Sequence, residues 1–313
     1  MNVYGPVMSR RLGLSLGIDP VMPKSCNWNC VYCQLGRTFP RVGGRKRFCI
    51  PESVLEEAGR QLDLQRDRQI DWVTFVGSGE TMLSSDIGKM IRGLKQMTSI
   101  PVAVITNGSF LGDAIVAEEL SSADAVLPTL DAGSKELFWR INRPLPEFSY
   151  DRHIEGLKAF RSSYHGNFWL EVMLIKGLND DEHAINQLTD VIAEISPDEV
   201  HLLVPTRPPA EDWVRPADDG ALLYAASVMG RVCKVLIPSE PTQELGAFEG
   251  NLPEALKEIV RRHPLRQEAL TAILERYGKQ EAERLFEAIM KSGDMKVIER
   301  MGAKFLVEGS SRH

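Results

Sequence analysis

The chain has 313 residues, of which 43% are hydrophobic and 26% charged, with a formal net charge of −6; this composition is typical of a globular protein with a sizeable core. It contains no uncharged apolar run of about 18 residues or more, and Arg10 and Arg11 precede any apolar run, so we predict no membrane span, no signal peptide and a cytoplasmic location. Five cysteines are too few, and odd in number, for a disulfide scaffold, which favours a reducing compartment.

Short apolar runs alternate with amphipathic stretches along most of the chain. The apolar runs predict buried strands at Leu14–Asp19, Trp72–Gly77, Val102–Asn107, Ala125–Leu130, Trp169–Ile175 and Val200–Val204, with Val232–Ile237 as a candidate for one more. The amphipathic stretches predict helices at residues 52–65, 86–97, 112–121, 150–162, 181–195 and 219–231. Because this is the pattern of βα units, we expect an α/β fold with a parallel sheet and with its chemistry at the carboxyl ends of the strands.

Basic side chains are concentrated at the start of the chain. Residues 1–48 hold eight Lys and Arg residues against a single acid, Asp19, and five of the eight lie within residues 37–47. Three interpretations remain open for this block: a solvated loop, a bed for an anionic substrate, or a docking face for an acidic electron donor.

Three cysteines lie close together after the first predicted strand. Cys26, Cys30 and Cys33 have the spacing C-x3-C-x2-C. Three thiolates so placed can hold a [4Fe–4S] cluster and leave one iron open to a non-protein ligand. A structural zinc site normally needs four ligands, and only Cys30 and Cys33 form a C-x2-C pair, since Cys49 and Cys233 stand alone.

Polar residues follow the next predicted strands. The run Gly77-Ser78-Gly79-Glu80 ends the second strand, and it combines flexible backbone with a carboxylate that can hold an ammonium group. Asn107 and Thr129 stand at the ends of the third and fourth strands. Each of these motifs also occurs in ordinary turns, so none is specific by itself.

A carboxylate and two arginines complete the candidates. Glu171 lies in an otherwise apolar strand, where a charge is costly unless paired; we expect it to face the barrel interior, towards a cofactor or a basic partner such as Arg143. Arg207, in the proline-rich loop after the sixth strand, and Arg143 are both candidates for binding an anionic substrate group.

The pattern changes after the sixth βα unit. Residues 1–238 are predicted as one core domain, and residues 239–251, rich in proline and glycine, as a linker. Residues 252–313 predict three helices, at Leu252–His263, Leu265–Tyr277 and Lys279–Met290, followed by two short strands, at Met295–Ile298 and Ala303–Val307. This C-terminal α+β module resembles a winged helix-turn-helix, but its third helix carries Glu281, Glu283 and Glu287, which is unfavourable for phosphate binding. We expect a docking or lid role, and a passive appendage is the alternative.

The cysteine motif, with Tyr32 before its third Cys, resembles the signature of the radical S-adenosylmethionine (SAM) superfamily. Further segments are similar to a subgroup of Fe–S oxidoreductases near the wyosine-type tRNA base synthases: Gly5–Gly13, Ser15–Asp19, Tyr32–Thr38, Asp131–Gly133 and Pro205–Pro209. The similarity covers roughly residues 1–240, although the second cysteine triplet of the wyosine synthases is missing from this chain.

This resemblance implies a partial (βα)6 radical SAM barrel. It implies a [4Fe–4S] cluster on Cys26, Cys30 and Cys33, with SAM as the second cofactor, and an electron donor such as flavodoxin or ferredoxin. The expected SAM-binding residues are Tyr32, Gly77, Ser78, Gly79, Glu80, Asn107, Thr129, Glu171 and Leu203, with Tyr32 and Leu203 beside the adenine.

The implied activity is reductive cleavage of SAM and hydrogen abstraction from an anionic small molecule or an RNA base. Two other functions stay open. One is a non-enzymatic Fe–S sensor whose C-terminal module binds nucleic acid, although the near-neutral charge of that module is unfavourable. The other is a zinc clip in an RNA-binding protein.

Overall fold

The computed structural model describes residues 1–66, 69–238, 252–268, 270–271, 279–291, 293–300 and 302–309. Within them, eight strands form one sheet in chain order: β1 Val3–Ser9, β2 Gly13–Ile18, β3 Trp72–Phe75, β4 Val102–Thr106, β5 Ala125–Pro128, β6 Asn167–Met173, β7 Glu199–Leu203 and β8 Lys234–Leu236. Neighbouring strands from β2 to β8 run parallel, while β1 pairs antiparallel with β2. The predicted α/β fold with a parallel sheet is therefore confirmed.

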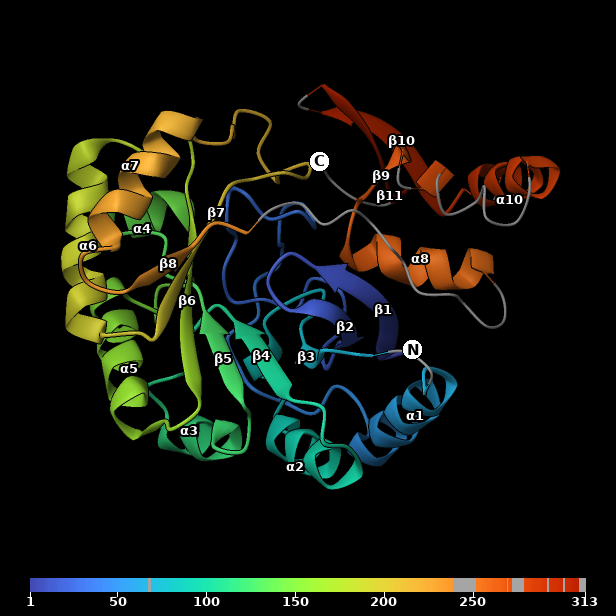
Figure 1. Ribbon diagram of the computed structural model, residues 1–313, viewed down its shortest axis with the longest axis horizontal. Coiled ribbons are helices and arrows are strands. Elements are labelled where there is room, and N and C mark those ends of the chain that lie inside the picture. Colours follow the sequence, from blue (N-terminus) through green and yellow to red (C-terminus); the bar gives the residue numbers. More distant parts are fainter. Residues whose placement is uncertain are drawn as a thin grey trace.

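Helices follow the parallel strands and cover the outer face of the curved sheet (Figure 1). They are α1 Pro51–Leu64, α2 Ile87–Met97, α3 Ala114–Leu120, α4 Lys135–Ile141, α5 Tyr150–Ser163, α6 Glu182–Ile195 and α7 Asp219–Met229, with a short 3-10 helix, η1, at Thr81–Leu83. Several begin at a polar side chain that accepts a hydrogen bond from the first turn, as Asp181 does for α6 and Ser149 for α5. Among the residues that the structure describes, no helix has both the length and the apolar character needed to cross a bilayer.

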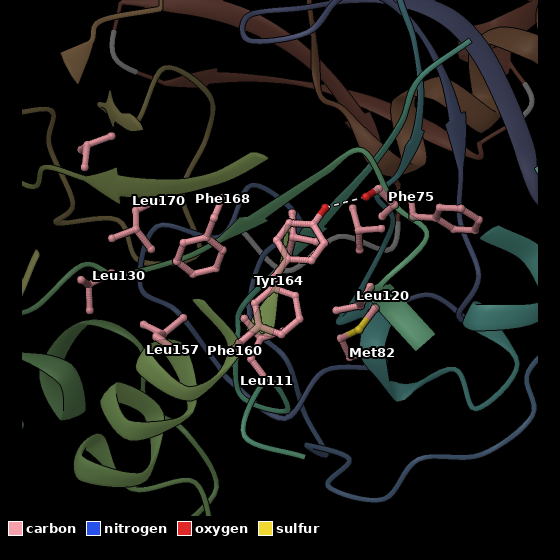
Figure 2. Packing of buried hydrophobic residues seen from close by; sticks show 14 of the residues in the cluster. Phe75, Met82, Leu111, Leu120, Leu130, Leu157, Phe160, Tyr164, Phe168 and Leu170 are labelled. Atoms are coloured by element: carbon pink, nitrogen blue, oxygen red, sulfur yellow. Dashed lines mark hydrogen bonds between the residues drawn. The ribbon is translucent and has the colours of Figure 1, made fainter. Parts of the chain in front are cut away.

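The main hydrophobic core lies between the sheet and these helices. Figure 2 shows part of it, where Phe160 of α5 and Tyr164, the residue after this helix, pack near Phe168 of β6 and Leu120 of α3. Tyr164 keeps its polar end satisfied by donating a hydrogen bond to the carbonyl oxygen of Ala123 at 2.7 Å. With the apolar surface buried on the helical side, the loops at the carboxyl ends of the strands are left to build a site.

The C-terminal residues form a second, smaller unit (Figure 1). It contains α8 Leu252–Arg262, β9 Leu265–Arg266, α10 Lys279–Lys291, β10 Met295–Arg300 and β11 Ala303–Glu308, and its three strands pair antiparallel in the order β10-β11-β9. The predicted helix over Leu265–Tyr277 is wrong at its start, because Leu265 and Arg266 pair with β11 as a strand. The predicted linker, residues 239–251, lies outside the described residues. Classification as a winged helix stays a prediction.

Candidate active site

A cavity of about 340 Å³ opens at the carboxyl ends of the parallel strands. Its volume falls in the range of small-molecule sites. Most of the residues singled out from the sequence line it, namely Cys26, Cys30, Cys33, Tyr32, Gly77, Ser78, Gly79, Glu80, Asn107, Thr129, Glu171, Leu203 and Arg207. Arg143 is not among the lining residues. These residues come from five loops, those after β2, β3, β4, β5 and β7, and from the strands β6 and β7, so the cavity joins segments that are far apart in the sequence.

The three cysteine side chains come from the loop between β2 and α1, and each is half-buried. The Sγ atom of Cys26 faces the backbone N–H of Trp28 at 3.4 Å and Nδ2 of Asn107 at 3.9 Å, and Sγ of Cys30 lies 3.7 Å from Nδ2 of Asn142. Amide donors directed at thiolate sulfur are the contacts that tune Fe–S clusters. In the described part of the chain, no three His, Cys, Asp or Glu side chains are grouped closely enough to hold a single metal ion.

The thiols lie where an added positive charge would stabilise them as thiolates. Burial raises the pKa of Cys26 to about 12, with a further contribution from the Glu80 carboxylate, and burial also raises the pKa of Cys30 well above its usual value. Metal ions favour the thiolate form, so cysteines of this kind are suited to bind iron rather than to remain ionised on their own.

Lys24 provides a second indication that an anionic group binds beside the cysteines, although it lines a smaller neighbouring cavity and not the main one. Its Nζ atom is buried without a hydrogen-bond partner in the described structure, and its backbone has a φ of 64°. Burial lowers its pKa, which the nearby Cys33, Glu308 and Cys26 partly offset. A buried ammonium without an acceptor is costly, and a cluster held by three thiolates would place negative charge beside it. The cysteines and Lys24 therefore fit an Fe–S cluster.

Gly77 and Gly79 let the cysteine loop pack directly against the end of β3. A Cβ atom at Gly79 would lie 2.0 Å from the carbonyl oxygen of Ser25, the residue before Cys26. A Cβ atom at Gly77 would lie 2.0 Å from Oδ1 of Asp19. These glycines are needed for close backbone approach within the protein, in addition to any contact with a ligand.

Glu80 is held rigidly at the floor of the cavity. Its buried carboxylate accepts hydrogen bonds from the Thr106 hydroxyl at 2.5 Å, the Asn107 backbone N–H at 2.7 Å and the Met82 backbone N–H at 2.9 Å. Burial raises its pKa, and these three donors act in the opposite direction. A carboxylate has about four acceptor positions, so one is left for an ammonium group in the cavity.

Tyr32 and Asp131 link the cysteine loop to the end of β5. The Tyr32 hydroxyl donates to Asp131 Oδ2 at 2.6 Å, and the same oxygen accepts from Asn142 Nδ2 at 2.6 Å. Burial raises the pKa of Asp131 to about 6, although its hydrogen bonds favour the ionised form. Tyr32 is therefore fixed by its hydroxyl, with its ring on the cavity wall.

The two arginine candidates have different roles. Glu171 pairs with Arg11 at 2.5 Å, not with Arg143 as the sequence suggested. Arg143 instead pairs with the buried Glu211 at 2.5 Å, and the backbone carbonyl oxygen of Arg143 accepts a hydrogen bond from Arg41 at 2.8 Å. Arg143 is thus part of the scaffold around the cysteine loop, and Arg207 alone of the pair lines the cavity.

The C-terminal unit supplies one wall of the cavity, which sequence reasoning missed. Ile259, His263 and Leu265 line it together with Arg10 and Arg11 from the β1–β2 turn. The wall is fixed to the cysteine loop because Gln34 Nε2, next to Cys33, donates to the carbonyl oxygen of Arg262 at 2.9 Å. The sequence offered some indication of the two arginines, because Arg10 and Arg11 are adjacent charged residues shortly before a predicted strand. Nothing in the sequence pointed to His263.

A buried ion pair ties this wall to the core. Arg262 Nε donates to Asp19 Oδ2 at 2.8 Å, with both side chains at most 9% exposed. Asp19 also accepts a hydrogen bond from the Ser78 hydroxyl at 2.8 Å, and the Arg262 guanidinium lies 4.8 Å from the Tyr4 ring centroid. The end of α8 is therefore bound to the same residues that shape the Gly77–Glu80 turn.

Comparison with known proteins agrees with this geometry. The family model of the radical SAM superfamily matches residues 21–188. The UPF0026 protein of Methanocaldococcus jannaschii is 31% identical over 278 residues, which cover 87% of this chain and 85% of that protein. GTPase Obg of Brachyspira hyodysenteriae is 36% identical over 236 residues, but these cover 75% of this chain and only 34% of that protein. The chain thus spans about a third of the length of the Brachyspira protein.

Two solved structures share the fold. A radical SAM methyltransferase from Sphaerobacter thermophilus superposes with a TM-score of 0.57 at 16% identity, over 71% of this chain and 65% of that one. TYW1 with a lysine–pyruvate adduct bound superposes with a TM-score of 0.50 at 17% identity, over 70% of this chain and 74% of that one. At these identities the likeness concerns the fold alone.

Proposed function

We propose, because this chain belongs to the radical SAM superfamily and to the UPF0026 proteins, that it is an enzyme that cleaves SAM reductively to abstract hydrogen from an anionic substrate. The observation that carries the proposal is the meeting of Cys26, Cys30 and Cys33 with the Gly77–Glu80 turn in one cavity. Family membership implies an Fe–S cluster and SAM.

The three cysteines would hold three irons of a [4Fe–4S] cluster and leave the fourth for SAM. A bound cluster would supply the single electron that reductive cleavage of SAM to methionine and a 5′-deoxyadenosyl group requires. The protein would contribute orientation: the remaining acceptor position of Glu80 suits the SAM ammonium group, and Asn107 and Thr129, which line the same cavity, are proposed to make polar contacts to the ribose. Tyr32 and Leu203 offer flat and apolar surface for adenine.

The substrate is proposed to be anionic because Arg207 lines the cavity, with Arg10 and Arg11 beside it. The electron is proposed to come from a small protein such as flavodoxin or ferredoxin. Arg37 and Arg47 are about 60% exposed, which leaves them accessible to an acidic partner although each also pairs with a carboxylate of this chain.

The direct test is anaerobic reconstitution of the full chain with iron and sulfide, followed by incubation with SAM and dithionite. We expect release of 5′-deoxyadenosine and methionine in equal amounts. Protein that binds a redox-active cluster but never cleaves SAM would contradict the proposed activity.

Lys24 is expected to raise the reduction potential of the cluster, because its positive charge stabilises the added electron. Lys24→Gln should shift the midpoint potential to more negative values by several tens of millivolts, on the order of 1–2 kcal/mol of lost Coulomb energy. Lys24→Arg keeps the charge and serves as the matched control. An anaerobic redox titration followed by electron paramagnetic resonance measures both, and an unchanged potential in Lys24→Gln would exclude this role.

A further inference from the structure

The charged side chains that line the cavity are separated by sign. The acids Glu80, Asp131 and Glu171 belong to the ends of β3, β5 and β6, whereas the bases Arg10, Arg11 and Arg207 come from the β1–β2 turn and the loop after β7. Arg11 meets Glu171 at the boundary between the two groups. The polar contacts proposed for SAM, from Glu80, Asn107 and Thr129, lie on the acidic side, which leaves the guanidinium groups of the basic side for another molecule.

The C-terminal unit completes the basic side with a neutral imidazole. His263 Nδ1 lies 3.1 Å from Gln34 Nε2. Because the Gln34 amide nitrogen can only donate, Nδ1 must accept and the ring proton is carried by Nε2. Burial lowers the pKa of His263 to about 3, and the charges of Arg207, Arg11 and Arg10 act in the same direction. His263 is therefore a neutral hydrogen-bond donor surrounded by guanidinium groups.

The wall is held in place by a side-chain hydrogen bond to its backbone. Arg207 Nε donates to the carbonyl oxygen of Pro264 at 3.1 Å, so the loop after β7 and the end of α8 are joined beside His263. Two further polar atoms on lining residues, Nε of Arg11 and Oγ1 of Thr206, are buried without a hydrogen-bond partner in the described structure. Buried polar groups normally have a hydrogen-bond partner, so these atoms indicate a ligand with several hydrogen-bond acceptors.

We infer that Arg10, Arg11, Arg207, Thr206 and His263 form a subsite for a phosphate group of the substrate. The inference deepens the proposed function, since it names the chemistry of the molecule from which hydrogen is abstracted. Three guanidinium groups from two separate loops can surround a tetrahedral dianion. A carboxylate, by contrast, needs only the two parallel N–H donors of one guanidinium group. The phosphate can belong to a free phosphorylated metabolite or to a nucleotide of RNA, and both present the same oxygens.

The test is calorimetric titration of the purified full chain with inorganic phosphate, with acetate as the monoanion comparison. We expect saturable binding of phosphate and none of acetate. The double variant Arg10→Gln, Arg207→Gln should bind phosphate at least about tenfold more weakly, because two charged hydrogen-bond donors are removed. Arg140→Gln is the matched control: Arg140 is 52% exposed on α4, outside the cavity lining, and its loss should leave phosphate binding unchanged.

Two more ligands identify the source of the phosphate. Arginine-dependent binding of ribose 5-phosphate supports a free metabolite, and arginine-dependent binding of a tRNA transcript without ribose 5-phosphate binding supports RNA. A circular dichroism melt of each variant shows whether it is folded. Arg207→Lys keeps the positive charge but loses the paired N–H donors of the guanidinium group, so it should bind phosphate with intermediate strength.

Equal phosphate affinity in the wild type and the double variant, or no saturable binding at all, would overturn the subsite. Release of 5′-deoxyadenosine is measured on the same preparation without any phosphate ligand. Failure of that release refutes the radical activity, whereas failure of phosphate binding with intact SAM cleavage refutes the subsite alone.

Discussion

Replacing Cys30 by alanine is expected to remove both the Fe–S cluster and the cleavage of SAM. Two thiolates, Cys26 and Cys33, cannot hold a cluster that needs three protein ligands and one open corner. After anaerobic reconstitution, the Cys30→Ala protein should show background iron and sulfide, no visible absorbance of a cluster, and no release of 5′-deoxyadenosine with dithionite.

The chain offers a matched control for this experiment in Cys233. Its side chain is half-buried, packs against the main core near β8 and lies 3.6 Å from the carbonyl oxygen of Met229, outside the cavity lining. Cys233→Ala should therefore retain cluster content and SAM cleavage. SAM turnover by Cys30→Ala at the wild-type rate would refute the assignment of the cysteines.

Replacing Asp19 by alanine is expected to cause a large decrease in the free energy of unfolding. The substitution removes one of the two carboxylates that pair with the buried Arg262 guanidinium, and it also removes the acceptor of the Ser78 hydroxyl. Breaking a buried ion pair in this way typically costs about 3–5 kcal/mol of unfolding free energy. Glu258, which also pairs with Arg262 at 2.8 Å, keeps the expected loss towards the lower end of that range.

Urea unfolding of Asp19→Ala and Asp63→Ala provides the comparison. Asp63 pairs with Arg66 on the surface, where the two side chains are 67% and 76% exposed, so its loss should change the unfolding free energy by less than about 1 kcal/mol. A similar small change in both variants would mean that the pair between Asp19 and Arg262 does not stabilise the protein.

The candidate site could be predicted from the sequence where a short motif follows a strand. Cys26, Cys30 and Cys33 lie within eight residues, and Glu80 and Asn107 come directly after apolar runs, so the geometry of a parallel sheet is enough to bring them together. That rule says nothing about which side chains become partners. Arg11 and Arg143 were both available to Glu171, and only the tertiary fold decides between them.

The parts of the fold that were missed depend on contacts distant in sequence. β1 contains Gly5 and Pro6 and has no clear alternation, yet it pairs with β2 through residues such as Val3 and Ile18. Leu265 and Arg266 read as the start of a helix, but their backbone pairs with Phe305 and Leu306 about forty residues later. The local pattern of apolar residues cannot reveal such strand pairings, because the free energy that favours them comes from tertiary packing.

The wall contributed by α8 has a consequence for how this enzyme can diverge. The parts proposed to generate the radical lie before Pro238, whereas Ile259, His263 and Leu265 reach the cavity from beyond it. Exchange of the C-terminal segment would therefore replace the His263 side of the proposed phosphate subsite, while Arg10, Arg11 and Arg207 and the residues proposed to form the radical would stay in place. Descendants of this chain can then change the shape and polarity of that wall without any change in the loops that carry the other subsite residues.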